Sequence, residues 1–562
     1  MRTRSGNLHL EIQTSRKNPV GLLRTSFRDP ATGKIAHTQH GRVTGVSLDQ
    51  LKTLQLAFRE KVVPAGSAQA LRILSSREFG ASNALLDLAR DIGLHPALYS
   101  RSERWVDAAL AMIVGRVIYQ GSKLKLCRQA DRSCLWELCG IEGAPDVDEH
   151  CYEPLDRLLE RQTAIQKKLA AKHLCASSQK SSLVLYDITS SYFEGEYKES
   201  ELVAFGYNRD QKKGHRQVVI GLLCGADGCP VACEVFKGNT NDGTTVEGKI
   251  EELRKRYGLE KVIFVGDRGM LTAARLKALK GIAGLSTISA LTHHQLADLV
   301  ARKVIQPELF DERDIAEISD PDNDGERYCL CKNPLTAESE TETRKRLLAL
   351  SVEGLGAIAD YKKKTTVEIL GARVGKLLAK YKMGKFIKWE VEPAPDGAKK
   401  SLAHRVVWTI DEEKIAREQS LDGCYIVRTD VTADCMGKEQ IVASYKALGH
   451  VERAFRSLKL SHLEIRPVYH KSDRRIKAHV FMCVLAYYLQ WHLVERLRPL
   501  FEADGEGKDR HWTVRDVIEK LAGIRSNRVL VEGVEFNQLT EMDKEQREIL
   551  RLLKTTPGKE AA

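Results

Sequence analysis

The sequence predicts an α/β protein whose mixed-sheet core is interrupted by an inserted α+β subdomain. From residue 181 onward, short apolar segments bounded by turn residues alternate with helical periods in the order β-β-β-α-β-α-β, which favours a mixed sheet with helices against it. A long interruption then separates these segments from two further helices. At 562 residues the chain is too long for one hydrophobic core. We therefore expect five segments: 1–175, 176–291 (first part of the core), 292–440 (the insertion), 441–503 (second part of the core) and 504–562 (a small helical tail that could serve oligomerisation).

The positive charge of the chain is concentrated in two places. The net charge is +12 and the isoelectric point about 9.0. Residues 1–61 hold eleven Lys and Arg against four Asp and Glu, and residues 445–477 hold nine against three. Local basic excess of this kind is typical of a surface that contacts the phosphates of a nucleic acid.

The thirteen cysteines and the hydropathy pattern indicate a reduced, cytoplasmic protein without a membrane span. The amino terminus lacks the apolar core of a signal peptide, and the longest apolar run, residues 480–489, is shorter than the roughly 20 residues that cross a bilayer. Cys224, Cys229 and Cys233 are spaced closely enough to suggest zinc, but no CxxC pair accompanies them. We interpret them as buried structural thiols.

The amino-terminal region combines strands and helices. The segments LHLEIQ, GLLRTSF and KIAHTQ predict short strands separated by turns. Apolar residues at three-to-four spacing predict helices over residues 68–74, 81–92, 105–119 and 152–174. A basic β region followed by short helices fits a nucleic-acid-binding domain, and it also fits a helical scaffold.

Two of the predicted core strands end on an aspartate. The strands are SLVLYD, RQVVIGLLC, PVACEVFKG, KVIFVGD and LSTISAL, with helices over residues 244–257 and 271–279. Asp187 closes the first strand and Asp267 the fourth. A carboxylate in this position is held on a rigid element, as a metal ligand requires; the same position also suits a turn or helix-cap residue.

The insertion begins with an acidic segment, residues 308–326. Helical periods follow at residues 343–361 and 367–381, and the segments KFIKWEVE, HRVVWTI and CYIVRTDV predict strands. The combination predicts an α+β subdomain that separates the two parts of the core.

A basic helix follows the insertion. Tyr445, Glu452 and Lys459 stand at steps of seven, which places them on one face of a continuous helix. Further helices are expected over residues 478–497, 514–521 and 544–553. Glu452, Asp187 and Asp267 together would supply three hard oxygen ligands, which suit Mg²⁺ or Mn²⁺ rather than zinc. Two such ions about 4 Å apart support phosphoryl transfer by activating a water or a 3′-hydroxyl.

Four segments in order give the chain a family resemblance. They are SLVLYDITSSYFEG, QVVIGLLCGADGCPVACEVFKGNTNDG, VGDRGMLT and YKALGHVERAFRSLK with IRPVYHKSDRRIKAHVFMCVLAYYL, and they span about residues 181–500. Together they resemble the DDE transposases of bacterial insertion sequences, in the insertion-sequence-four branch with its Tyr-Arg-Glu-Lys signature. Tyr445, Glu452 and Lys459 fit the signature spacing, whereas Leu448 stands at the Arg position.

The resemblance implies an RNase H-like core with Asp187, Asp267 and Glu452 as the catalytic, metal-binding triad for two Mg²⁺ ions, with Mn²⁺ as an alternative. It also implies that Tyr445 and Lys459 contact DNA phosphates. The surrounding cations are further candidates for DNA contacts: Arg268, which could instead pair with a triad carboxylate, Arg453 and Arg456, which could replace the signature Arg, and Arg466, Arg474 and Arg475. In the insertion, Trp389 and Trp408 could stack on a flipped base or pack within strands.

The activity expected from the resemblance is cut-and-paste transposition. The partners would be double-stranded DNA of the terminal inverted repeats and of the target, bound by a homodimer that brings two ends together in the bacterial nucleoid. The amino-terminal segment would bind the DNA ends. Two alternatives remain open from the sequence: an RNase H-like metal-dependent nuclease that does not join strands, and a non-catalytic DNA-binding protein descended from a transposase.

Overall fold

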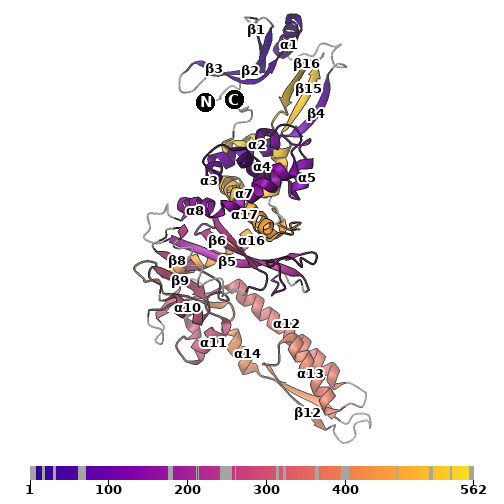
Figure 1. The fold of residues 1–562 in the computed structure, drawn as a ribbon. Coiled ribbons are helices and arrows are strands. Elements are labelled where there is room, and N and C mark those ends of the chain that lie inside the picture. Colours follow the sequence, from indigo (N-terminus) through magenta and orange to yellow (C-terminus); the bar gives the residue numbers. More distant parts are fainter. Residues whose placement is uncertain are drawn as a thin grey trace. The chain divides into compact units, whose positions relative to one another are not determined.

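The computed structural model, drawn as a ribbon in Figure 1, is divided into two compact units by its internal contacts. Unit 1 comprises residues 1–259 and 449–562, and unit 2 comprises residues 260–448. The structure describes residues 8–555 except for 15–18, 29–32, 61–70, 175–181, 210–211, 213, 241–255, 258, 260, 281, 312–314, 320–324, 361–365, 394–403, 462, 464, 467, 506–510 and 532–533. Most of the helix expected over residues 244–257 therefore lies outside the described residues.

Unit 1 begins with the β region expected from the sequence. Strands β1 (Leu8–Gln13), β2 (Val20–Arg28) and β3 (Ile35–Val43) form an antiparallel sheet in that order, and α1 (Leu48–Glu60) packs against β1. Leu10, Leu23 and Leu51 lie in the small core between sheet and helix. The predicted strand segments are confirmed here.

A second sheet joins the two ends of the chain. Strand β4 (Arg72–Glu78) pairs antiparallel with β15 (Arg525–Val531), which pairs with β16 (Val534–Leu539). Two predictions were wrong at this sheet: residues 72–74 are strand rather than helix, and the carboxy-terminal tail is not wholly helical. Strands β4 and β15 pair with each other across about 450 residues, and no local pattern reveals such a partner. Strand β16 joins the sheet through a hairpin with β15. The tail helices α19 (Val514–Ala522) and α20 (Lys544–Leu553) are confirmed.

A helical region follows β4 and shares its core with the second half of the chain. Its helices are α2 (Gly80–Asp91), α3 (Leu94–Leu98), α4 (Arg104–Tyr119), α5 (Lys123–Arg128), α6 (Leu135–Leu138), the π-helix η1 (Asp148–Tyr152), α7 (Glu153–Glu160) and α8 (Gln162–His173). Helix α17 (Asp473–Arg496) packs against α2, α4 and α7 and is buried over most of its length (Figure 1). The short helix α18 (Arg498–Ala503) follows it. None of the described helices is long and apolar enough to cross a membrane.

Three long antiparallel strands complete the framework of unit 1: β5 (Ser182–Phe193), β6 (Arg216–Gly225) and β7 (Pro230–Lys237). The prediction that Asp187 ends its strand was wrong. Asp187 lies in the middle of β5, opposite Leu222, because residues 188–193 continue the pairing with β6. Its position is therefore held by strand on both sides.

Unit 2 contains a mixed sheet in the order β10-β11-β14-β9-β8. Strand β8 (Val262–Val265) runs parallel to β9 (Leu285–Ala290), and α10 (Ala273–Leu279) lies between them in sequence. The antiparallel strands of the insertion extend this sheet: β14 (Cys424–Thr429), β11 (Arg327–Lys332) and β10 (Ala316–Ser319). Helices α11 (His293–Ala301) and η2 (Pro307–Leu309) follow β9. Three strands of the insertion, β10, β11 and β14, thus belong to the same sheet as the core strands β8 and β9.

The rest of the insertion has a core of its own. It consists of α12 (Pro334–Ala359), α13 (Val367–Tyr381), the hairpin β12 (Ile387–Pro393) and β13 (His404–Ile410), and α14 (Glu412–Gln419). Leu355, Val374 and Phe386 are among the residues at its centre. This part of the chain combines helices with a two-stranded hairpin, and α13 has the predicted bounds. Helix α15 (Lys438–Lys446) ends the unit.

A buried cluster of basic side chains lies where α5 meets α17. The Lys123 ammonium contacts Nδ1 of His479, and the His470 ring packs against the rings of His479 and Tyr152, with centroids 5.5 and 5.7 Å apart. Burial lowers the pKa of Lys123 to about 8 and the pKa of His470 to about 3. The positive charges of Lys123 and Arg475 lower the pKa of His470 further. His470 is therefore neutral in the folded protein at neutral pH.

This cluster predicts that unit 1 loses stability in mild acid. A histidine with an ordinary pKa near 6.5 in the unfolded chain binds a proton below that pH, whereas His470 in the folded protein does so only near pH 3. His470 therefore makes its full contribution above about pH 6.5 and loses it as pH falls towards 3, by at most about 1.4 kcal/mol per pH unit. In urea unfolding between pH 7 and 4.5, His470→Gln should give a shallower decline than the wild type. Tyr469→Phe, at the exposed neighbouring position, should leave the decline unchanged, and an equal slope in both variants would contradict the assignment.

Candidate active site

Asp187 is a half-buried carboxylate on a rigid strand. Its neighbours on β5, Tyr186 and Ile188, are buried at 5% and 1% exposure. Its Oδ1 accepts the N–H of Ile188 at 2.7 Å and lies 4.0 Å from Nη1 of Arg209. The side chain is thus fixed at its base by the backbone and faces a nearby guanidinium.

Asp267 is an exposed carboxylate in a tight turn after β8. The strand ends at Val265, two residues earlier. Its Oδ1 accepts the N–H of Arg268 at 2.7 Å, and its carbonyl accepts the N–H groups of Met270 and Leu271 at 3.0 and 3.1 Å. Because Met270 and Leu271 are buried, they anchor the turn and hold the aspartate two residues beyond the end of the strand, rather than as its last residue.

Glu452 projects from the exposed side of an amphipathic helix, α16 (Leu448–Arg456). Val451, Ala454 and Phe455 form the buried side of this helix. The carboxylate therefore stands on the polar face, which fits a group that meets a ligand rather than the core.

The prediction of one continuous helix from Tyr445 to Lys459 was wrong. Tyr445 lies on α15, a turn at Ala447 separates α15 from α16, and Lys459 lies in a π-helical turn, η3 (Ser457–Ser461). Gly449, a poor helix former, is the second residue of α16. Steps of seven therefore do not place the three signature residues on one helical face.

Leu448, which occupies the position of the signature arginine, is a buried residue at 9% exposure. Its apolar side chain contributes to packing at the start of α16. In this chain the position serves the core and carries no cation.

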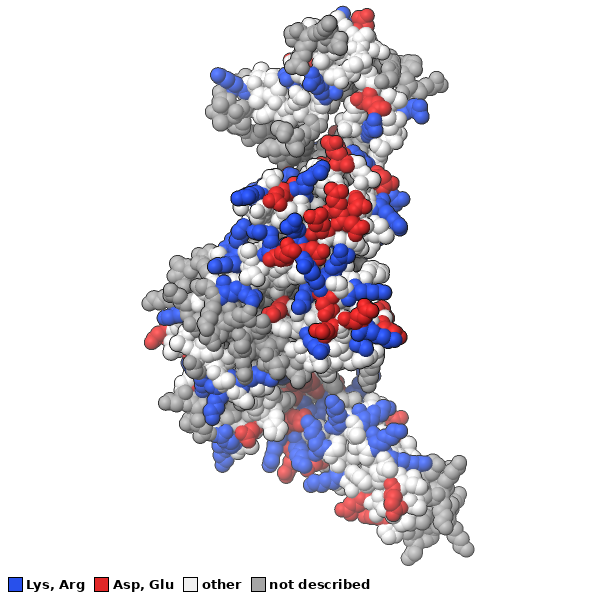
Figure 2. Space-filling view, viewed as in Figure 1, with Lys and Arg blue, Asp and Glu red and all other residues white. Residues whose placement is uncertain are grey.

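Two of the candidate DNA-contacting cations are ion-paired within unit 1. Arg474 lies 2.6 Å from Glu160 and 3.4 Å from Asp156, and Arg475 lies 3.8 Å from Asp156. The Arg475 guanidinium also stacks on Tyr152, 4.6 Å from the ring centroid. Acidic side chains lie among the basic ones on the face shown in Figure 2. The basic excess counted along the sequence is thus partly neutralised by acidic side chains that the fold brings close.

The remaining candidate cations are placed differently. Arg466 stacks on Tyr192 at 4.3 Å from the ring centroid, and Nε of Arg453 donates to the Gly449 carbonyl at 3.3 Å. Arg456 and Arg268 are exposed. Arg453 and Arg456 both lie on α16 with Glu452, so two cations accompany this carboxylate on its own helix.

Trp389 and Trp408 face each other across the β12–β13 hairpin as paired residues. Both pack against the hydrophobic core of the insertion. Strand packing, one of the two readings of the sequence, accounts for these side chains in the structure.

The structure also reveals a group of potential metal ligands that the sequence did not. His173, Cys229 and His492 each offer a ligand atom, and the three atoms lie within 4.8 Å of one another. Within either unit, the described residues place no three acidic side chains this close. No motif could have found the group, because its members are far apart along the chain and lie on different elements. Of the three cysteines whose spacing suggested zinc, Cys229 belongs to this group and Cys224 and Cys233 do not.

The sequence matches the profile of the transposase DDE domain over residues 178–489. This stretch is more than half of the chain and includes Asp187, Asp267 and Glu452. The chain belongs to the DDE transposase family, whose members are metal-dependent enzymes that cleave DNA and transfer strands.

Among solved structures, the chain is similar to the piggyBac transposase in a synaptic complex with hairpin DNA, determined by cryo-electron microscopy. The sequences are 9% identical, the alignment covers 79% of this chain and 77% of that one, and the TM-score is 0.34. No curated protein sequence matches the chain.

Proposed function

We propose that the protein is the transposase of an insertion sequence, which cleaves the ends of its element and joins them to target DNA. The observation that carries the proposal is the family match over residues 178–489, which contains all three candidate carboxylates. Within that stretch, Asp187 and Asp267 are held by the backbone at their strands, and Glu452 stands exposed on a helix beside cations. We assign the protein to the branch with the Tyr-Arg-Glu-Lys signature, with Leu448 as its departure from the pattern.

The three carboxylates would form the catalytic triad of an RNase H-like core that contains β5–β7 together with β8 and β9. Their donor chemistry fits Mg²⁺ or Mn²⁺, because these ions prefer carboxylate oxygens. A pair of such ions, when bound, would activate the attacking water or 3′-hydroxyl and stabilise the leaving oxygen. The backbone hydrogen bonds at Asp187 and Asp267 would hold both carboxylates in one orientation. Glu452 would complete the site from the second half of the chain.

The cations near the triad would position the DNA. Tyr445, Lys459, Arg453, Arg456 and Arg268 are the candidates for phosphates close to the cut. Arg466, Arg474 and Arg475 already contact aromatic or acidic side chains. We therefore assign them to phosphates farther from the cut, for which they would leave these protein partners when DNA binds. The amino-terminal segment, with its basic β region, would recognise the terminal inverted repeats. Because two ends must be processed together, we expect a homodimer in the synaptic complex.

A cleavage and joining assay tests this proposal. Purified protein is incubated with labelled DNA carrying the inverted repeats that flank the reading frame, a supercoiled target plasmid and Mg²⁺. We expect cuts at the repeat ends and joined products that require the divalent ion. Asp187→Asn and Asp267→Asn should abolish both products while end binding persists in a gel-shift experiment. Cutting without joining would favour a nuclease, and end binding without any cutting by the wild type would favour a non-catalytic DNA-binding protein.

A further inference from the structure

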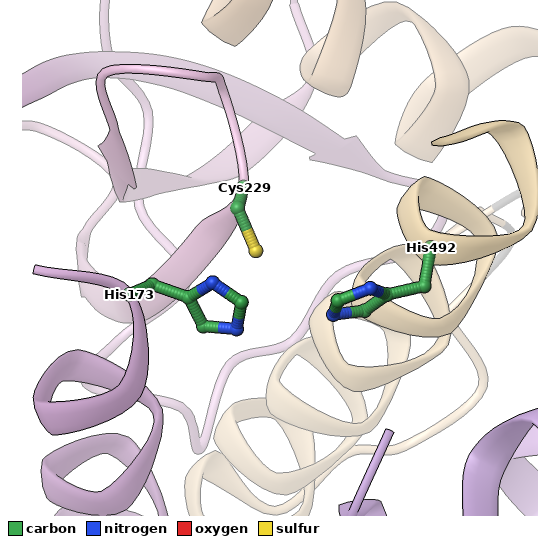
Figure 3. A group of neighbouring side chains, drawn as sticks. All are labelled: His173, Cys229 and His492. Carbon is green, nitrogen blue, oxygen red and sulfur yellow. The ribbon is translucent and has the colours of Figure 1, made fainter. Parts of the chain in front are cut away.

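The group formed by His173, Cys229 and His492 has the composition of a site for a borderline-soft metal ion. His173 ends helix α8, Cys229 lies in the turn between β6 and β7, and His492 lies near the end of α17. All three belong to unit 1. Figure 3 shows their side chains pointing towards one another from these three elements. The group thus joins the helical region, the sheet and the carboxy-terminal core helix at one point.

The distances between the three ligand atoms are close to those between the ligands of a bound metal ion. The three ligand atoms lie within 4.8 Å of one another. In a tetrahedral zinc site, bonds of about 2.0–2.3 Å place ligand atoms roughly 3.3–3.8 Å apart. Side-chain rotations that move an atom by about 1 Å are enough to close the difference.

One imidazole nitrogen of the group lacks a hydrogen-bond partner in the described part of the chain. Nε2 of His492 is buried and has no hydrogen-bond partner among the described residues. Nε2 of His173 lies 3.0 Å from the hydroxyl of Tyr488. With Nε2–H as the donor of this hydrogen bond, Nδ1 of His173 carries the lone pair that an ion needs. A buried nitrogen without a partner is costly, and a metal ion would supply that partner.

The thiol and its surroundings complete the set. Cys229 is fully buried at 0% exposure. Its backbone N–H donates to Oδ1 of Asp227 at 3.0 Å, which fixes the turn, and Gly228 between them has a φ of +84° that favours glycine. A thiol binds the ion as a thiolate, so the ion must displace the proton of Cys229. Asp227 also supplies negative charge next to the site.

We propose that His173, Cys229 and His492 bind one Zn²⁺ ion that ties α8, the β6–β7 turn and α17 together. Two imidazoles and a thiolate favour Zn²⁺ over Mg²⁺ or Mn²⁺, which take oxygen ligands. The site is therefore chemically distinct from the carboxylates assigned to catalysis, and a water would complete its four-coordinate shell. On binding, the S–H bond of Cys229 breaks, its proton leaves to solvent and a zinc–sulfur bond forms. No atom changes its oxidation state. Packing of the His492 ring against Tyr488 and Trp491, with centroids 4.6 and 4.9 Å apart, is the alternative reason for these residues to lie together.

Cobalt titration of the full-length protein tests the site. Protein stripped with a chelator under reducing conditions receives excess Mg²⁺, which saturates oxygen-ligand sites, and then Co²⁺. We expect a thiolate-to-cobalt charge-transfer band in the near ultraviolet and intense visible bands of tetrahedral Co²⁺, saturating at one ion per chain and abolished by Zn²⁺. Cys229→Ser should lose the charge-transfer band, and His492→Gln should weaken Co²⁺ binding at least tenfold.

The matched control is Cys224→Ser, which changes an equally buried thiol in the same hairpin, at 0% exposure, and should keep the band. A wild-type protein without a charge-transfer band, or a band that survives in Cys229→Ser, would overturn the proposal and leave the aromatic cluster as the explanation. If Cys229→Ser does not fold, X-ray absorption of the zinc-loaded wild type decides the matter. One sulfur with nitrogen ligands supports the site, and a shell of oxygen and nitrogen alone refutes it.

Discussion

Glu452→Gln is expected to reduce DNA cleavage and strand transfer by at least about a hundredfold, because it replaces a charged ligand of the catalytic ions by a neutral amide. Loss of residues that merely orient metal ligands already costs about 10–100-fold in comparable sites, and a direct ligand should cost more. The side chain is exposed on α16, so the substitution should leave the melting temperature unchanged. Product formation at saturating Mg²⁺, measured with the end-DNA substrate, gives the comparison.

The matched control for this variant is Glu439→Gln, an exposed glutamate in the first turn of α15. It removes the same charge from a nearby helix and should leave the rate within about twofold. Raising the Mg²⁺ concentration should restore part of the activity of Glu452→Gln if the defect is in metal binding. Wild-type activity in Glu452→Gln would remove this residue from the site.

Glu78→Ala is expected to destabilise unit 1 by at least about 3 kcal/mol. Glu78 is buried at 5% exposure where β4 meets α2. Its carboxylate accepts the N–H groups of Ala81 and Ser82 at 2.7 and 3.1 Å, and it also accepts the hydroxyl of Tyr119 at 2.6 Å. Each bond to a charged acceptor contributes about 1.5–3 kcal/mol, and its removal leaves buried donors without partners. The negative charge at the start of α2 adds a favourable interaction with the helix dipole.

Chemical unfolding followed by circular dichroism measures this effect. Glu78→Gln keeps an acceptor oxygen and the shape of the side chain, so it should cost less than Glu78→Ala. Glu137→Ala provides the surface control, because the Glu137 side chain is 52% exposed and its ion pair with Arg77 is of the kind that contributes at most about 1 kcal/mol. If Glu78→Ala destabilised the protein no more than Glu137→Ala, the buried hydrogen bonds of Glu78 would not make the contribution to stability that we expect.

Local patterns predicted most elements of the fold, and they failed where the stabilising partner lies far away in sequence. The bounds of α13 and α20 could be read from apolar spacing and capping residues, because a helix depends on neighbours three and four residues away. Strand β4 could not, since its partner β15 lies near the other end of the chain. The extension of β5 beyond Asp187 was missed for a similar reason, because the pairing with β6 overrides the turn suggested by the polar residues.

In the candidate site, too, some features follow from local patterns and others depend on residues that only the fold brings together. Acids near strands and on a polar helical face, such as Asp187, Asp267 and Glu452, can be recognised from residue type and pattern. The split between α15 and α16 and the ion pairs of Arg474 depend on packing and on acids from another helix. The grouping of His173, Cys229 and His492 depends entirely on the fold, because nothing links these residues along the chain.

Iron-directed cleavage of the protein tests the central claim most directly. Fe²⁺ bound in place of Mg²⁺ generates hydroxyl radicals with peroxide and ascorbate, and these cut the polypeptide next to the metal. If the three carboxylates hold the catalytic ions, mass spectrometry should locate cuts in all three segments around Asp187, Asp267 and Glu452. Excess Mg²⁺ should suppress them, and Glu452→Gln should weaken them together. Cuts confined to one segment, or cuts unchanged by Glu452→Gln, would show that these residues do not share a metal site and would contradict the proposed mechanism.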